Sequence, residues 1–121
     1  MNVQTINFLN KLKNYSLYGK QKVIFSYNKN KLQFLEILYQ EGLIQSFSFC
    51  LHLTVYLHLS KVCLQYLKIL SSPANSKYFK LNQINRFKSI KRTLIFSTNQ
   101  GLLTLHNCRK HKVGGTLLFL C

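Results

Sequence analysis

Acidic residues are almost absent from this sequence. The 121 residues include no Asp and only two Glu, against 17 Lys and Arg, so that the formal net charge is +15. Two carboxylates, Glu36 and Glu41, cannot hold two metal ions and also act as general acid and base. A surface with this charge repels itself unless a polyanion neutralises it. The sequence therefore predicts a protein that is not an enzyme, has no cofactor or small-molecule substrate, and binds nucleic acid.

Arg, Ala and Pro are also scarce. Lys outnumbers Arg 14 to 3, Asn occurs 11 times, and Ala and Pro occur once each. Lys, Asn, Ile, Phe and Tyr have AT-rich codons, which suggests an AT-rich genome such as that of an organelle. Residues 1–12 contain neither the Arg nor the Ser that is typical of a transit peptide. We therefore expect a protein that is made where it works, or one that works in a cytosol.

Apolar residues are abundant despite the charge. They make up 47% of the chain, with 9 Phe and 7 Tyr, which is too many for a disordered basic tail. Their periodicity predicts the α+β class, with one half at residues 1–61 and a second half at residues 62–121. In the first half we expect the order helix, strand, helix, strand, strand.

The two helices of the first half have clear sequence signals. A helix over residues 3–15 would bury residues spaced three apart, namely Val3, Ile6, Leu9 and Leu12. A short strand is expected at residues 23–25. Asn28 is a candidate N-cap and Gly42 a candidate C-cap of the second helix. The apolar side of this helix would consist of Leu32, Leu35, Leu38 and Tyr39.

The longest apolar stretch, Leu43–Leu59, requires a comparison with a membrane segment. From Phe47 onward the odd positions are apolar, and the even positions hold Ser, Cys, His, Thr and Tyr. A period of two predicts strand with the odd face buried, either as a tight hairpin or as one bent strand. A membrane helix would expose both His and several hydroxyls to lipid. The alternative is a small basic membrane-surface protein with Leu43–Leu59 against lipid.

The second half is predicted to be mostly β with short helices. A strand over residues 62–70, a proline-bearing loop at residues 71–76 and a short helix over residues 81–87 come first. A strand at residues 93–98 then leads through Ser97–Gly101 into a helix with Leu102, Leu105 and Cys108 on one side. Gly114 and Gly115 are expected to end this helix before a last strand at residues 116–120.

Four Cys and four His raise the question of a zinc site. The spacings His106-x-Cys108-x-x-His111 and His52, His58, Cys63 do not match paired C-x-x-C ligands. No Cys–His pair has an acidic partner that would orient it for nucleophilic catalysis. We therefore predict no metal site and no catalytic residue.

The segment Ser97-Thr98-Asn99-Gln100-Gly101 is the most informative one for binding. If it joins a strand to a helix, the N–H groups at the helix start point outward beside two hydroxyls and two amides. Such groups can bind phosphate oxygens and ribose hydroxyls. A simple helix cap is the alternative interpretation.

The same segment carries a family resemblance. Residues 94–104, followed by Arg109 and by Gly114-Gly115 before an apolar strand, resemble the C-terminal signature of the small ribosomal subunit protein eight family. Three upstream segments are similar to family segments in the same order: Leu12-Lys13-Asn14, Glu41-Gly42-Leu43-Ile44, and Ser72-Pro73 with Tyr78. The chain departs from the family at three positions. Ser72 stands where Arg is usual, Cys108 where Ala or Gly is usual, and Thr116 where Glu is usual.

The resemblance implies a two-part α+β protein that binds the central domain of small-subunit ribosomal RNA and helps assemble the platform. Its other partners would be neighbouring small-subunit ribosomal proteins, with no membrane. An AT-biased member is expected in the mitochondrial ribosome and encoded in the organelle, with a plastid as the alternative. The residues expected to bind RNA are Ser97, Thr98, Asn99, Gln100, Gly101, Arg109, Lys110, Lys112, Gly114, Gly115, Lys11, Lys13, Asn14, Lys29, Lys31, Pro73 and Tyr78.

Overall fold

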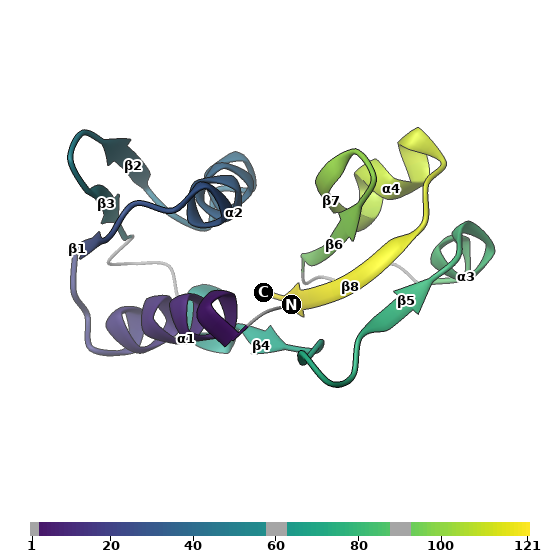
Figure 1. Cartoon of the computed structure of the whole chain (residues 1–121), viewed down its shortest axis with the longest axis horizontal. Helices are drawn as coiled ribbons and strands as arrows, with labels where there is room; N and C mark the ends of the chain where they lie inside the picture. The colour runs from purple at the N-terminus through teal and green to yellow at the C-terminus, as the bar shows by residue number, and fades with distance from the viewer. Residues whose placement is uncertain (1–2, 58–62, 88–92) are drawn as a thin grey trace. The chain divides into compact units, whose positions relative to one another are not determined.

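The computed structural model describes residues 3–57, 63–87 and 93–121, and Figure 1 shows its elements in chain order. The chain divides into two compact units, which we call the N-terminal unit (Gln4–Leu67) and the C-terminal unit (chiefly Lys68–Cys121). The boundary expected between residues 61 and 62 lies outside the described residues. Both units combine helices with an antiparallel sheet, which confirms the α+β class.

Helix α1 (Val3–Leu17) confirms the first predicted helix but not its predicted face. The residues that it buries are Thr5, Phe8, Leu9, Leu12 and Ser16. Val3, which was expected in the buried stripe, is 61% exposed. The three-residue spacing drifts around a helix of 3.6 residues per turn, so that only its later members face the core.

Helix α2 (Lys29–Gln40) begins and ends where its caps predict. The Asn28 side chain accepts a hydrogen bond from the Asn30 N–H at 2.9 Å. At the other end, the Gly42 N–H donates to the Tyr39 carbonyl and the Leu43 N–H donates to the Leu38 carbonyl at 2.9 Å. This pair of bonds is the Schellman motif, and Gly42 supplies the positive φ of +74° that the motif requires.

The N-terminal sheet has the order β1-β3-β2, with β1 (Lys22–Phe25), β2 (Ser46–Phe49) and β3 (Leu53–Tyr56). The hairpin of β2 and β3 confirms the first of the two arrangements expected there. Leu53, Val55 and Leu57 are fully or almost fully buried, as the odd-face prediction requires. The prediction is wrong for Phe49 and Leu51, which are 53% and 82% exposed at the turn end of the hairpin.

These strands account for much of the apolar stretch that was compared with a membrane segment. Nowhere in residues 3–57, 63–87 and 93–121 is a helix both long enough and apolar enough to cross a membrane.

The prediction of a single strand over residues 62–70 is wrong for most of the residues that the structure describes there. Residues Cys63–Tyr66 form a 3-10 helix, η1, which is followed by the two-residue strand β4 (Lys68–Ile69). Leu64 and Leu67 are both buried, and their spacing of three residues fits the three residues per turn of this helix. Residues 71–76 form the predicted loop.

The C-terminal sheet is built around β8 (Gly115–Leu120). This strand pairs with β4, with β5 (Lys77–Phe79) and with β6 (Leu94–Thr98), and β6 pairs in turn with β7 (Gly101–Thr104). All of these pairs are antiparallel. The predicted strands at residues 93–98 and 116–120 are therefore confirmed.

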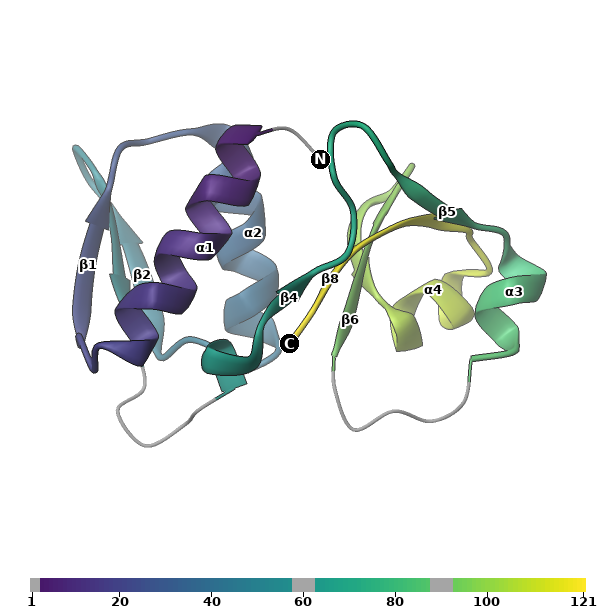
Figure 2. The same ribbon diagram turned by 90° about the horizontal axis from the view of Figure 1, so that it is seen from below.

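Two short helices, α3 (Leu81–Asn85) and α4 (Leu105–His111), cover one face of this sheet (Figure 2). Their side chains and those on the adjoining face of the sheet form a hydrophobic core, whose buried members are Ile84, Leu94, Phe96, Cys108 and Leu117. Phe79 and Phe87 pack edge-on against each other at a centroid distance of 5.2 Å beside it. Because Phe96 and Leu117 face the helices, their strand neighbours must face the opposite side of the sheet.

Candidate nucleic-acid interface

The segment Ser97–Gly101 forms the tip of the β6–β7 hairpin. Thr98 pairs with Gly101, which leaves Asn99 and Gln100 as the two turn residues. The expectation that this segment joins a strand directly to a helix is therefore wrong, because β7 intervenes and α4 begins only after Thr104. The Thr104 hydroxyl caps α4 by accepting a hydrogen bond from the Asn107 N–H at 3.3 Å. The N–H groups of this segment therefore belong to a hairpin turn and not to the start of a helix.

The Thr98 hydroxyl holds the turn together. It donates to the Gly101 carbonyl at 2.8 Å and accepts from the Gln100 N–H at 3.1 Å. Gly101 has φ of +104°, which residues with a side chain rarely adopt. The Ser97 hydroxyl and the side-chain amides of Asn99 and Gln100 form no hydrogen bond within the described part of the chain. The turn therefore presents uncharged donors and acceptors on a backbone that the Thr98 hydroxyl holds in place.

A row of four paired residues crosses the sheet next to this turn. Tyr78 on β5 pairs with Thr116 on β8, Thr116 pairs with Ser97 on β6, and Ser97 pairs with Leu102 on β7. Paired residues point to the same face, and this face is opposite to α3 and α4. Tyr78 is 62% exposed and Ser97 is exposed. We call the polar members of this row, Tyr78, Thr116 and Ser97, together with the turn residues Asn99 and Gln100, the polar row.

Gly114 and Gly115 allow the strands to approach each other beside the polar row. A Cβ on Gly115 would lie 2.6 Å from the Ser97 carbonyl oxygen and 2.8 Å from the Thr98 methyl group. A Cβ on Gly114 would lie 2.7 Å from the Phe79 carbonyl oxygen. The prediction that these glycines end the preceding helix is wrong. The left-handed residue that ends α4 is Lys112, at φ +56°.

Gly115→Ala is expected to destabilise the C-terminal unit by about 1–3 kcal/mol, as overpacking against fixed backbone does. The Ser97 carbonyl belongs to a paired strand and cannot move aside without breaking the ladder. Urea unfolding followed by circular dichroism measures the change. Thr116→Ala, at the next position of β8, is the control, and its effect should stay within about 1 kcal/mol. Equal stability of Gly115→Ala and the parent would contradict the close approach.

Arg109 has an internal role that its sequence position does not reveal. Its Nε and Nη2 atoms donate to the Ile84 carbonyl at 3.3 and 3.2 Å, and Nη2 also donates to the Phe87 carbonyl. The guanidinium group therefore binds carbonyls at the end of α3 and joins this helix to α4. Lys110 and Lys112 are exposed and form no such bonds within the described residues.

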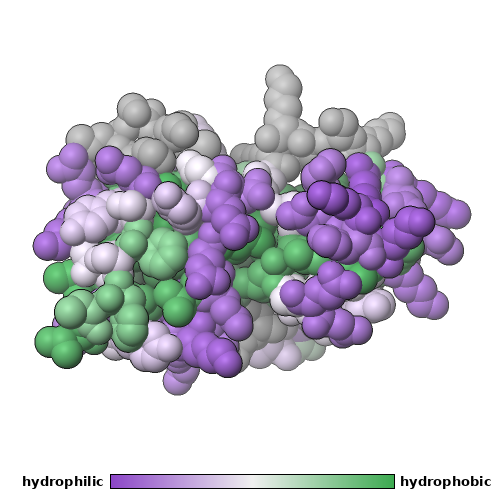
Figure 3. All heavy atoms as spheres, turned by 90° about the horizontal axis from the view of Figure 1, so that it is seen from above, coloured by the Kyte–Doolittle hydropathy of each residue, from purple (hydrophilic) through white to green (hydrophobic). Residues whose placement is uncertain are grey.

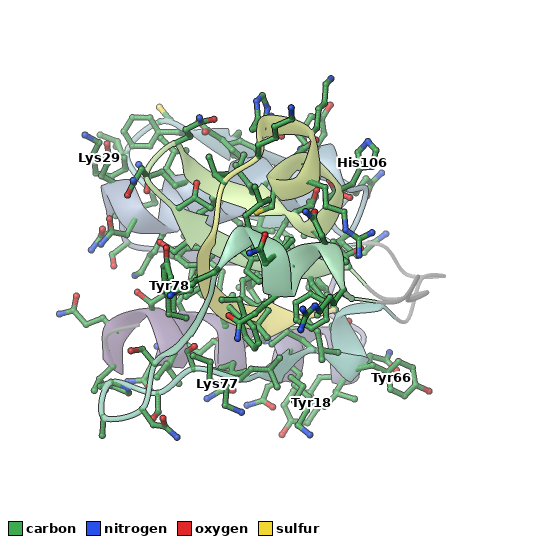
Figure 4. The ribbon with its side chains drawn as sticks, turned by 90° about the vertical axis from the view of Figure 1, so that its right-hand side faces the viewer. Tyr18, Lys29, Tyr66, Lys77, Tyr78 and His106 are labelled. Atoms are coloured by element: carbon green, nitrogen blue, oxygen red, sulfur yellow. The ribbon has the colours of Figure 1, made fainter. Side chains whose placement is uncertain are left out.

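The side chains around the sheet differ in direction. In Figure 4, Tyr78 and His106 project from opposite sides of the C-terminal unit, and Lys77 lies exposed beside Tyr78 at the start of β5.

Pro73 is exposed in the preceding loop, where the Asn75 N–H donates to the Ser72 hydroxyl at 3.1 Å. The loop is anchored by the buried Ser71 hydroxyl, which donates to the Leu117 carbonyl.

The N-terminal unit contains a groove of about 360 Å³ between α1 and the segment that enters α2. Two of the predicted RNA-binding residues, Lys11 and Lys31, line it together. The Lys31 ammonium donates to the Ser26 hydroxyl at 3.2 Å and lies 5.9 Å from the centre of the Phe8 ring. The remaining lining residues were not predicted and are Gln4, Asn7, Phe8, Phe25, Ser26, Tyr27 and Asn28.

The side of the groove that α1 forms could have been predicted from the sequence. Gln4, Asn7 and Lys11 are spaced by three and four residues and so share one side of α1. The other predicted residues of this unit, Lys13, Asn14 and Lys29, do not line the groove. Lys13 and Asn14 lie on α1 and Lys29 is the first residue of α2. Asn14 and Lys29 are exposed, and Lys13 is half-buried.

Cys108 belongs to the core of the C-terminal unit. Burial raises the pKa of its thiol to about 11. The thiol is therefore protonated near neutral pH, and it is not the thiolate that a nucleophilic or metal-binding cysteine requires.

Comparison with known proteins gives a match along nearly the whole chain. The family model described as "Ribosomal protein S8" matches residues 4–121. The small ribosomal subunit protein uS8 of Carsonella ruddii (strain PV) is 32% identical over 120 residues, which cover 97% of this chain and 95% of that protein. The small ribosomal subunit protein uS8c of Bigelowiella natans is 30% identical over 123 residues, with 92% of each chain covered. The uS8 protein of Dichelobacter nodosus is 28% identical over 118 residues, which cover 93% of this chain and 92% of that protein.

Proposed function

The chain belongs to the ribosomal protein S8 family of structural, non-catalytic components of the small ribosomal subunit, and we propose that it binds the central domain of the small-subunit ribosomal RNA and helps assemble the platform. The observation that carries this proposal is the polar row. It combines free hydroxyl and amide groups with an exposed tyrosine ring on one face of a rigid sheet.

The polar row fits the chemistry of folded RNA. An A-form helix offers its shallow minor groove, its 2′-hydroxyls and its phosphates, whereas its major groove is too deep and narrow for side chains to enter. The Ser97 hydroxyl and the Asn99 and Gln100 amides can exchange hydrogen bonds with ribose and phosphate oxygens. Gly101 leaves the end of the turn without a side chain, and Gly114 and Gly115 allow the strands that carry these groups to approach each other. Tyr78, with Pro73 before it, offers an apolar surface on which an unstacked nucleotide can stack.

The groove of the N-terminal unit is the second proposed RNA contact. Lys11 and Lys31 provide two positive charges for phosphate, and Asn7 and Asn28 provide amides beside them. The Tyr27 ring, which is 49% exposed, offers apolar surface to a sugar or a base. Lys13, Asn14 and Lys29 add charge and hydrogen-bonding groups at its flanks.

The basic end of α4 supplies charge without fixed geometry. Lys110 and Lys112 are exposed, and their long side chains can reach any nearby phosphate. Arg109 adds its charge although its Nε and Nη2 atoms bind carbonyls. These residues therefore contribute to affinity for RNA in general, whereas the polar row contributes to the choice of site.

A double variant, Ser97→Ala with Asn99→Ala, separates these two contributions. We expect it to weaken binding to a transcript of the central domain by about 1 kcal/mol for each hydrogen bond lost. The dependence of affinity on salt should not change, because neither residue is charged. Thr98 is left intact because its hydroxyl holds the turn. Filter binding at several salt concentrations measures both quantities, with an unrelated RNA duplex as the second ligand.

Lys110→Ala is the matched control for this double variant. It should weaken binding to both RNAs alike and lower the slope of log affinity against log salt by about one. If the double variant binds the central-domain transcript as tightly as the parent does, the polar row is not the RNA site.

The compartment is a further part of the proposal. The excess of Lys over Arg, 14 to 3, and the 11 Asn fit a gene in an AT-rich organellar genome. We expect the protein in the small subunit of the mitochondrial ribosome, with the plastid ribosome as the alternative. Sedimentation of gradient-purified organelle lysates, probed with an antibody to this chain, distinguishes the two compartments.

A further inference from the structure

Positive charge is missing from a large part of the N-terminal unit. Residues 32–60 contain none of the 17 Lys and Arg of the chain, and they contain both of its acidic residues, Glu36 and Glu41. Both Glu residues are exposed on or just after α2. This part of the surface is therefore unsuited to phosphate, in contrast to the groove with Lys11 and Lys31.

The same region exposes large apolar and aromatic side chains. Leu51 is 82% exposed, and Phe49 and Tyr39 are each 53% exposed. Tyr27 packs on Phe49 with ring centroids 4.4 Å apart, and Tyr39 packs on Phe47 at 5.9 Å. These contacts hold the rings along one side of β2. We call Tyr39, Phe47, Phe49 and Leu51 the hairpin surface, whereas Tyr27 belongs to the groove with Lys11 and Lys31.

The view in Figure 3 shows hydrophobic side chains reaching the surface over part of the N-terminal unit, whereas the C-terminal unit is largely hydrophilic on the face shown. Single exposed apolar residues are ordinary, but a contiguous group of this kind marks an interaction site. The strand beneath it, β2, lies at an edge of its sheet and consists of Ser-Phe-Ser-Phe. Edge strands usually carry Lys or Pro that prevent pairing with other chains, and β2 has neither.

We infer that the hairpin surface binds a basic polypeptide segment of another small-subunit protein. The local charge selects this occupant. Glu36 and Glu41 attract Lys and Arg, and the exposed faces of Tyr39 and Phe49 accept a guanidinium or ammonium group by cation–π contact. Aromatic side chains and Arg are the residues that contribute most to protein interfaces. The inference rests on the proposed function only in that the partner is part of the same ribosomal particle.

Two other occupants fit these observations less well. An RNA strand would bring phosphates to a surface with two carboxylates and no Lys or Arg in residues 32–60. A second copy of this chain, in a two-fold dimer, would place the same surface on both sides and so bring Glu residues against Glu residues. A basic segment alone supplies the opposite charge.

A photo-reactive residue, p-benzoylphenylalanine, at position 51 tests the inference in intact subunits. Leu51 is suitable because it is largely exposed, so that its replacement leaves the core unchanged. The same residue placed at Ser97 is the RNA-directed control. After irradiation of purified small subunits, the products are treated with ribonuclease and the attached peptide is identified by mass spectrometry.

The expected product from position 51 is a ribonuclease-resistant adduct to a Lys- or Arg-rich peptide of one other small-subunit protein. An RNA adduct, an adduct to a second copy of this chain, or no adduct would each overturn the inference. The control has its own outcome, because loss of the RNA adduct at position 97 contradicts the polar row as an RNA site and leaves the inference about position 51 intact.

A pair of substitutions adds a measurement that needs no photo-reactive residue. In reconstituted subunits, Leu51→Ser is expected to increase by about tenfold the amount of the identified partner that is released by a salt wash. Loss of an important interface residue has an effect of this size. Ile24→Ser is the matched control, since Ile24 is 60% exposed on β1 of the same sheet and lies beside Lys22. Equal effects of the two substitutions would contradict a specific role for the hairpin surface.

Discussion

Replacing Leu53 or Val55 by Asp is expected to unfold the N-terminal unit. Both side chains are 0% exposed on the helix-facing side of β3, where a carboxylate would find no cation and no water. Burial of an unpaired charge is among the most destabilising of substitutions, at roughly 4 kcal/mol or more. Urea unfolding followed by far-ultraviolet circular dichroism, which reports on helix, measures the loss of unfolding free energy.

The outer face of the same strand provides the control. Thr54 is half-buried on that face and His52 is exposed in the turn. Asp at either position should change the free energy of unfolding by about 1 kcal/mol or less, which is the range of β-propensity effects. Equal damage on the two faces would show that β3 is buried on both sides.

RNA binding is expected to weaken steeply as the salt concentration rises. A net charge of +15, with Lys11, Lys31, Lys110 and Lys112 at or near the proposed contacts, neutralises phosphates and releases their counterions. If about six to eight phosphates are contacted, the slope of log affinity against log salt should be roughly −4 to −7. Between 50 and 200 mM salt the affinity would then fall by about 10² to 10⁴-fold. Filter binding with a central-domain transcript measures the slope.

A double variant of the groove, Lys11→Gln with Lys31→Gln, makes this expectation specific. It should reduce the magnitude of the slope by about two, because two phosphate contacts lose their cations. A slope near zero for the parent protein would refute the account of this chain as a binder of polyanions.

The parts of the fold that sequence predicts well are those with local causes. The caps of α2 depend on Asn28 and Gly42, whose side-chain and backbone preferences act over a few residues. The buried face of β3 depends on the alternation of Leu53, Thr54 and Val55, which is read without knowing the rest of the structure. The resemblance of residues 94–104 to a known family then indicated the family and, with it, the two-part architecture.

The parts that sequence predicts poorly depend on distant partners. Leu102, Leu105 and Cys108 have helical spacing, but Leu102 lies in β7 because β6 offers it a paired strand. Phe49 has the parity of a buried residue, yet it lies where the sheet ends. The role of Arg109 requires the carbonyl of Ile84, which is 25 residues away in sequence. Such contacts exist only in the folded unit, so no local sequence pattern predicts them.

The position of β8 in its sheet sets an order of events during synthesis. Among the strands of the described residues, β4 and β5 pair only with β8, which leaves the translating ribosome after both of them. The nascent chain can form the β6–β7 hairpin early, but Tyr78 and Ser97 stay unconnected until Thr116 arrives between them. Long-range pairing of this kind makes folding slow. Under the proposed function, the C-terminal unit would therefore recognise RNA only after β8 emerges, and a chain stalled before that point would carry its charge without an assembled polar row.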